Sequence, residues 1–302
     1  MSRISIHTLD LHFQHRETAI AAYLIRHADG AVLVECGPGS TIESLKTGLQ
    51  AHGLSLEDVT HVFLSHIHLD HAGAAGYLAR QGAEIYVHPV GAPHLRNPEK
   101  LLASAKRIYE DQMDALWGEF LPVPEERLHT PQDGEEIAIG NLRIVAVDTP
   151  GHAKHHYAYL VDGTCFTGDI GGVRMPGQRY LRLPLVPPDL HLETWRESIR
   201  RLQRLKPKRI APTHFGIYED ADWHLQAVLN ELDAVSRWLE EVMPADPSVE
   251  ELGQKVVAWM ETRGLQAGVD KETLRTYEIA NPTWMSATGL QRYWRKFRQP
   301  AS

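Results

Sequence analysis

The chain reads VFLSHIHLDHAG over residues 62–73, a short apolar segment that leads directly into three histidines and one aspartate. In an extended segment alternate side chains point the same way, so His66 and His68 can reach one metal ion. Asp70 and His71 stand where the chain turns toward a helix, and they can face a neighbouring ion. Imidazole and carboxylate suit zinc, and a catalytic zinc site keeps one position open for water. The stretch therefore predicts a metal centre at the end of a buried strand.

Three further ligand-type residues follow predicted strands. They are His152 in TPGH at 149–152, Asp169 in FTGD at 166–169, and His214 in PTHFG at 212–216. Each stands where a strand opens into a loop, and rigid scaffolds commonly mount catalytic groups at such positions. One histidine or aspartate of this kind is usually structural, but seven ligand-type residues in such settings indicate one shared metal site.

In their order these motifs resemble the metallo-β-lactamase superfamily, whose pattern is H-x-H-x-D-H followed by a histidine, a bridging aspartate and a last histidine. The resemblance covers about residues 1–240. It implies that one metal is held by His66, His68 and His152, that a second is held by Asp70, His71 and His214, and that Asp169 bridges both. Glu35 stands where many relatives carry aspartate, a departure that concerns only a contact behind the ligands.

The rest of the pattern predicts an α/β fold. Residues 4–87 alternate short apolar strands with helices, and residues 136–242 repeat the order of strands followed by helices. Two such halves predict two sheets packed face to face with helices outside, a four-layer αββα sandwich. We expect a catalytic domain over residues 1–242 and a helical C-terminal extension over residues 243–302. A capping box that starts at Ser248 opens this extension.

Composition narrows the range of partners. With 302 residues and 43% hydrophobic content the chain can bury a large core, and its net charge of -8 gives no electrostatic footprint for nucleic acid. No apolar run is long enough to span a membrane, and the N-terminus lacks a secretory pattern, so we expect a cytoplasmic protein. Cys36 and Cys165 are expected to be buried reduced thiols. The expected partner is a small-molecule substrate, and a homodimer remains an open alternative.

The predicted reaction is hydrolysis by a metal-bound hydroxide at a dinuclear site. Two divalent ions, zinc first with iron or manganese as alternatives, lower the pKa of bound water toward about 7. Asp70 is the expected catalytic residue, because it ligates a metal and can also accept a proton. A small ester, thioester or lactone is the expected substrate. The alternatives are a mononuclear iron oxidoreductase resembling persulfide dioxygenases, and a phosphodiesterase or nuclease of the same superfamily.

Substrate contacts are expected from two long segments beside the ligands, residues 98–117 and 171–188. Arg174, Tyr180 and Tyr218 are the candidate polar groups for holding substrate. His156 is a candidate for orienting a metal ligand from behind. The remaining histidines are expected to be structural or exposed. The basic residues of the C-terminal tail are expected to form a solvated helix face. They are Lys271, Arg275, Arg292, Arg295, Lys296 and Arg298.

Overall fold

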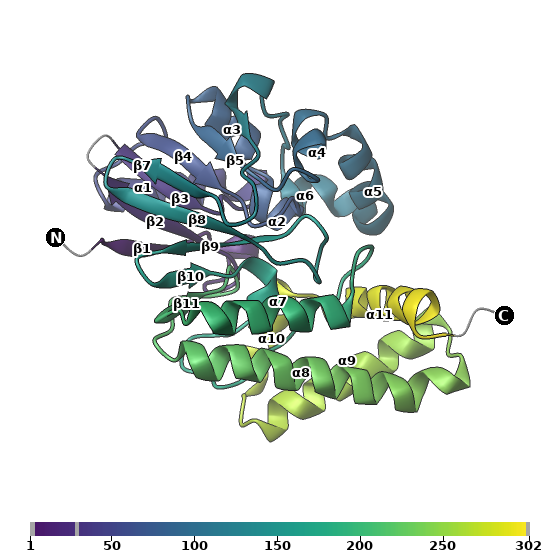
Figure 1. The fold of residues 1–302 in the computed structure, drawn as a ribbon. Helices are drawn as coiled ribbons and strands as arrows, with labels where there is room; N and C mark the ends of the chain where they lie inside the picture. The colour runs from purple at the N-terminus through teal and green to yellow at the C-terminus, as the bar shows by residue number, and fades with distance from the viewer. Residues whose placement is uncertain (1–3, 28–29, 300–302) are drawn as a thin grey trace.

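Two β-sheets form the centre of the molecule in the computed structural model, which describes residues 4–27 and 30–299. The first sheet has its strands in chain order: β1 (Ile6–Asp10), β2 (Ala21–His27), β3 (Gly30–Val34), β4 (Val59–Phe63), β5 (Glu84–Tyr86) and β6 (Leu128–His129). The second sheet has the order β11 (Arg209–Ala211), β10 (Thr164–Phe166), β9 (Tyr157–Val161), β8 (Leu142–Asp148) and β7 (Glu136–Ile139). Figure 1 shows the two sheets stacked, with helices on both outer sides.

Three clusters of buried side chains fill the spaces between the layers. Leu24 and Leu33 of the first sheet pack with Leu45 and Leu49 of a covering helix. Because successive strand residues point to opposite faces, their neighbours Tyr23, Ile25, Val32 and Val34 instead meet Ile144, Tyr159 and Phe166 of the second sheet. The outer face of the second sheet packs on Trp195 and Leu225 of two further helices. The architecture is therefore a four-layer αββα sandwich, as the sequence predicted.

The helices of the first half cover the first sheet and one end of the sandwich. They are α1 (Ile42–Ala51), α2 (Leu69–Ala72), α3 (Ala75–Arg80), α4 (Ala92–Arg96), α5 (Glu99–Tyr109) and α6 (Met113–Trp117). The segment over residues 98–117 is not one continuous helix, because it is interrupted between α5 and α6, where Glu110 takes a positive φ of 48°. Strand β6 and helix α4 were not anticipated, because each is only a few residues long.

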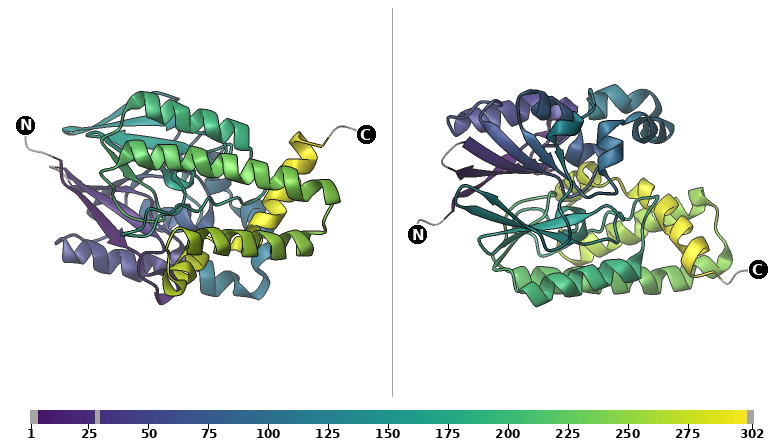
Figure 2. Two further views of the ribbon diagram at one scale, coloured as in Figure 1. Left: turned by 90° about the horizontal axis from the view of Figure 1, so that it is seen from below. Right: turned by 45° about the horizontal axis from the view of Figure 1, so that its top comes forward.

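The second half of the chain contributes the longer helices. They are α7 (Leu192–Leu205), α8 (Ala221–Val242), α9 (Val249–Gln266), α10 (Lys271–Ala280) and α11 (Thr283–Phe297). Side chains of α9 and α11, among them Leu252 and Leu290, share one buried cluster with Trp195 of α7 and Leu232 of α8. Helix α10 reaches the other half, since Tyr277 belongs to the cluster beneath the first sheet. Figure 2 shows α9 and α11 crossing beside α8.

The fold brings several strand ends to one edge. Strand β10 is parallel to β11 and antiparallel to β9, and β9 is antiparallel to β8. Strands β8, β10 and β11 therefore run the same way and end at the same edge of the second sheet. The loops that carry His152, Asp169 and His214 follow these strands. Among the described residues, none of the helices is long and apolar enough to cross a membrane.

Candidate metal centre

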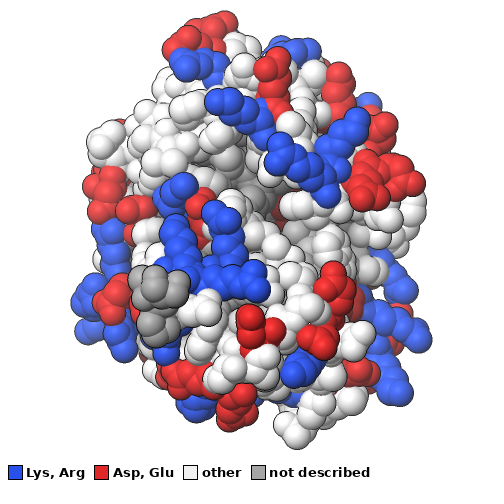
Figure 3. All heavy atoms as spheres, turned by 90° about the vertical axis from the view of Figure 1, so that its right-hand side faces the viewer, with Lys and Arg blue, Asp and Glu red and all other residues white. Residues whose placement is uncertain are grey.

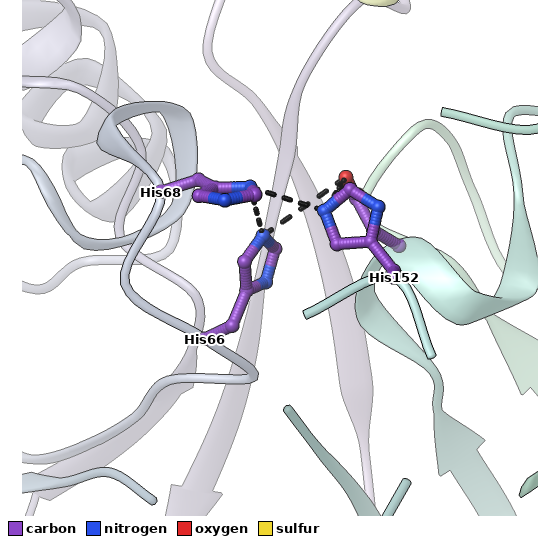
Figure 4. A group of neighbouring side chains, drawn as sticks. His66, His68 and His152 are labelled. Atoms are coloured by element: carbon purple, nitrogen blue, oxygen red, sulfur yellow. Dashed lines mark hydrogen bonds and ion pairs between the residues drawn. The ribbon is translucent and has the colours of Figure 1, made fainter. Parts of the chain in front are cut away.

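The first ligand group joins both sheets of the sandwich. His66 and His68 come from the segment after β4, and His152 comes from the turn after β8. Figure 4 shows the three imidazoles converging on one point. Nε2 of His66 lies 2.8 Å from Nδ1 of His68, and Nε2 of His152 lies 3.0 Å from the same nitrogen. Asp169 completes this group, whose ligand atoms all lie within 4.8 Å of one another.

The second ligand group lies beside the first. Asp70 and His71 belong to α2, and His214 follows β11. Oδ2 of Asp70 is 3.4 Å from Nε2 of His71 and 3.4 Å from Nε2 of His214. The two imidazoles are buried, whereas the Asp70 side chain is 20% exposed. A short helix and a strand end thus present two nitrogens and one carboxylate to one point.

The carboxylate of Asp169 lies between the two groups. Its Oδ2 is 3.2 Å from Nε2 of His152, and its Oδ1 is 3.2 Å from Nε2 of His71 and 3.4 Å from Nε2 of His214. One oxygen therefore faces each group, as a carboxylate that bridges two cations requires. The buried atoms His71 Nε2 and Asp169 Oδ1 have no hydrogen-bond partner. Since buried polar atoms are almost always partnered, these unpartnered atoms fit a metal ion held by the second group.

Contacts behind the imidazoles fix which nitrogen faces the centre. His152 Nδ1 donates to the carbonyl of Pro184 over 2.8 Å, and His214 Nδ1 donates to the carbonyl of Ala19 over 2.7 Å. Because Nδ1 is engaged with a carbonyl behind the ring, each of these imidazoles presents Nε2 to the centre. His71 Nδ1 lies 3.2 Å from Oε1 of Glu35, a carboxylate 1% exposed. These contacts orient three ligand rings for metal binding.

His156 supports the bridging aspartate from behind. The backbone N–H of Asp169 donates to His156 Nε2 over 3.2 Å, and His156 Nδ1 lies 3.0 Å from the hydroxyl of Thr149. The approach is close because Gly168 has no side chain: a Cβ there would lie 2.6 Å from His156 Nε2, and its φ of +51° also favours glycine. His156 is thus where the sequence suggested, behind a ligand.

Electrostatics differ between the two groups. Burial and the neighbouring His71 lower the pKa of His66 well below its ordinary value, so its ring is neutral. Burial also lowers the pKa of His214, but the carboxylates of Asp169 and Asp70 outweigh it and raise that pKa to about 10. The same two carboxylates raise the pKa of His71 against burial. The second group therefore has the negative field that attracts cations.

A cavity of about 440 Å³ opens onto the metal centre. Four ligand candidates line it: His68, Asp70, Asp169 and His214. Most of the remaining wall is apolar. Helices α5, α6 and α11 contribute part of it, with Leu101, Ile108, Tyr109, Leu116, Trp117 and Met285. Parts of both segments expected to line the site do so, residues 100–117 and 184–188. The centre thus faces an apolar chamber with the more exposed carboxylate, Asp70, in its wall.

Comparison with known proteins identifies the family. The sequence matches the metallo-beta-lactamase superfamily over residues 15–214. The chain belongs to the metallo-beta-lactamase superfamily. A metallo-beta-lactamase fold-containing protein of Sulfurisphaera tokodaii is 29% identical over 181 residues, which is 58% of this chain and 68% of that protein.

Other members of the superfamily share parts of the chain or the fold. An atrochrysone carboxyl ACP thioesterase of Aspergillus fumigatus is 24% identical over 66% of this chain, but this covers only 38% of the fungal protein. The chain therefore spans well under half of that relative. The crystal structure of a metallo-beta-lactamase family protein from Thermus thermophilus covers 98% of this chain and is itself covered to 94%, with a TM-score of 0.66 and 20% identity. This likeness extends the shared fold into the C-terminal helices.

The structure brings all seven ligand candidates together, but it places the three substrate candidates elsewhere. Arg174, 5% exposed, makes a two-point ion pair with Asp220 at 2.7 and 2.9 Å. The hydroxyl of Tyr218 donates to the carbonyl of Arg174, and that of Tyr180 donates to the carbonyl of Met260 over 3.3 Å. Within the described residues none of the three lines the cavity. The expectation that they hold substrate is corrected accordingly: their polar groups brace the backbone.

Two parts of the cavity wall were not anticipated from the sequence. His155, expected to be structural, lines the cavity, and burial lowers its pKa to about 4. Residues 279–282 and Met285, from the end of α10 and the start of α11, also line it. The preceding TPGH motif could have drawn attention to His155. The contribution of α10 and α11 depends on long-range packing, for which the sequence has no local signal.

Proposed function

We propose that this protein is a dinuclear metal-dependent hydrolase that cleaves a small-molecule ester, thioester or lactone. The observation that carries the proposal is the placement of Asp169, whose two carboxylate oxygens face two separate ligand groups. Zinc is the proposed metal, because imidazole and carboxylate are common zinc ligands. Iron and manganese, which also bind such ligands, are the alternatives. Two such ions, held by these residues, would acidify a water molecule and polarise the scissile carbonyl.

The chain's own residues supply the rest of the mechanism. Asp70 is the ligand-type carboxylate with the greater exposure, and it lies in the cavity wall. It can hold the attacking water in line with a substrate carbonyl and accept its proton. The acyl group would occupy the apolar chamber, whose side chains exclude bulk water from the reacting centre. Departure of the alcohol or thiol then leaves a carboxylic acid in the site.

The shape and lining of the cavity support a carboxylic substrate. A chamber of about 440 Å³ has the size of sites that enclose small molecules. Leu101, Ile108, Leu116 and Met285 offer an acyl chain apolar contacts. The thioesterase named among the relatives acts on an acyl thioester, which lies within this class. A thioester with an apolar acyl group is therefore included in the proposal.

The alternatives lack a supporting observation. A mononuclear iron oxidoreductase would use only one ligand group, whereas both groups here have complete sets of converging atoms. A nuclease must neutralise many phosphates with Lys and Arg, but the chain carries a net charge of -8. We therefore propose hydrolysis of a carboxylic substrate at a two-metal site.

A substrate panel tests the proposal. Zinc-loaded protein would be assayed on aryl esters, acyl thioesters and lactones beside a bis-aryl phosphodiester and RNA, with Asp70→Asn as the matched inactive variant. We expect turnover of at least one carboxylic class and a loss of at least 100-fold in Asp70→Asn. Phosphodiester turnover that exceeds every carboxylic substrate by 10-fold would overturn the proposal.

A further inference from the structure

The mouth of the cavity carries a concentration of positive charge. Lys100 and Lys154 line the cavity itself. Arg292, Arg295 and Lys296 line an open groove of about 450 Å³ along α11. We call these five side chains the basic rim. Figure 3 looks onto this face and shows a hollow with Lys and Arg side chains gathered on two sides of it.

The groove on α11 adjoins the cavity through Arg292 and Pro188. Nε of Arg292 donates to the carbonyl of Pro188 over 3.0 Å, and Pro188 lines the cavity. Met285 of α11 lines the cavity as well, seven residues before Arg292 and eleven before Lys296. At 3.6 residues per turn these three side chains lie on one face of the helix. One face of α11 therefore leads from the apolar chamber to the cations.

Part of this charge is not neutralised within the protein. Lys154 Nζ lies 3.2 Å from Asp189, and Arg295 lies 3.7 Å from Asp246. In contrast, no carboxylate of the described residues pairs with Lys100, Arg292 or Lys296. All three of these side chains belong to exposed residues. In a chain with a net charge of -8, unpaired cations at the mouth of the cavity favour an anionic part of the substrate.

The spacing specifies where that anion must be. With a rise of 1.5 Å per residue, Arg292 lies about 10 Å and Lys296 about 16 Å along α11 from Met285. An anion bound there is separated from the acyl chamber by a long arm. Figure 3 also shows acidic side chains close to the hollow on the same face. The positive area is therefore small, which suits the phosphates of a small molecule better than the surface of an acidic protein.

Resting on the proposed hydrolase function, we infer that the substrate is an acyl thioester of coenzyme A. The acyl chain occupies the apolar chamber, the pantetheine arm follows α11, and the phosphates meet the basic rim. In the reaction water adds its oxygen to the acyl carbon, and the carbon–sulfur bond breaks. The carboxylic acid forms and the thiol leaves with a proton, so no oxidant or reductant is needed.

The test compares substrates that differ only in the phosphate-bearing part. Zinc-loaded protein would hydrolyse octanoyl-coenzyme A and octanoyl-pantetheine, and calorimetry would measure the binding of free coenzyme A and of pantetheine. We expect a preference of at least 10-fold for the coenzyme in both measurements, shrinking as ionic strength rises. In the double variant Arg292→Gln, Lys296→Gln the ratio between the two compounds should fall toward one. Lys255→Gln, an exposed change on α9, is the control and should keep the ratio.

The outcomes separate this inference from the proposed function. Equal handling of the coenzyme and pantetheine compounds would overturn the inference and leave the hydrolase proposal standing. Cleavage of an octanoyl group only when it is attached to an acyl carrier protein would do the same. If no carboxylic substrate is cleaved, the proposed function fails, and the calorimetric preference still decides whether the basic rim binds the coenzyme.

Discussion

Oε1 of Glu35 lies 3.2 Å from Nδ1 of His71, so a buried carboxylate after β3 holds an imidazole of the second ligand group. The same oxygen accepts from the hydroxyl of Thr213 over 3.0 Å, and Oε2 accepts from the backbone N–H of Ser65 over 3.3 Å. Glu35, which stands where many relatives carry aspartate, therefore still makes the contact behind the ligand. Glutamate reaches His71 and ties it to segments of both sheets.

We expect Glu35→Gln to weaken metal binding at the second group by about 10- to 100-fold, because an amide keeps the size of the side chain but loses the charge that orients and polarises His71. Competition with a chelator would measure the affinity for zinc. Glu126→Gln, an exposed change in a short 3-10 helix, should leave that affinity unchanged. Unaltered zinc affinity in Glu35→Gln would show that this carboxylate has only a packing role.

The apolar chamber predicts a limit on acyl chain length. Met285 is held in the cavity wall beside Tyr109, whose hydroxyl lies 3.3 Å from its sulfur. Met285→Trp should reduce kcat/KM for an octanoyl substrate by at least 10-fold and that for an acetyl substrate much less, because the larger ring fills the chamber. Val257→Trp, on an exposed part of α9, is the matched control. An equal loss for both chain lengths would contradict the assignment of the chamber.

Arg174 is predicted to stabilise the fold. Its guanidinium pairs with Asp220 and lies over the rings of Tyr218 at 4.0 Å and Trp223 at 4.6 Å. Arg174→Met should lower the free energy of unfolding by about 2–3 kcal/mol. This loss is smaller than for a fully buried ion pair, because Asp220 is partly exposed and water can still solvate it. Urea denaturation measures this, with the exposed Arg200→Met as control. Unchanged stability together with a raised KM would contradict this role and indicate that Arg174 binds substrate.

Acid sensitivity should arise in part from His224. Burial lowers its pKa to about 4, and its Nε2 donates to the carbonyl of Gly171 over 2.8 Å. In the unfolded chain this histidine has a pKa near 6.5, so below that pH the unfolded state binds a proton that the folded state does not. The free energy of unfolding therefore falls by about 3 kcal/mol as the pH is lowered from 6.5 toward 4. Unfolding free energies measured from pH 7 to 4 should therefore fall less steeply in His224→Gln. Identical slopes in both proteins would refute this origin.

The sequence predicted those parts of the molecule that have local signals. The alternation of strands and helices indicated the two-sheet sandwich, and the ligands were recognisable because each follows a strand in a short motif. Arg174, Tyr180 and Tyr218 were misplaced for a physical reason. A polar side chain in a loop near a ligand can point into a cavity or brace the backbone, and only tertiary packing decides between these directions.

The composition of the cavity wall could not be predicted from the sequence either. The contacts of Met285 depend on how α11 crosses the body of the protein, more than 100 residues after the other parts of the wall in α5 and α6. No periodicity within α11 records that crossing. The basic residues of α11 were expected to form a solvated face, and their place at the mouth of the cavity became visible only once the helix was positioned.

The stoichiometry of bound metal tests the central claim most directly. Elemental analysis of the purified protein, with Asp169→Asn beside it, counts the ions that the two ligand groups hold. We predict close to two zinc-type ions per chain in the unaltered protein and clearly fewer in Asp169→Asn, because the bridging carboxylate contributes to both groups. One iron per chain with no second metal would contradict the dinuclear assignment.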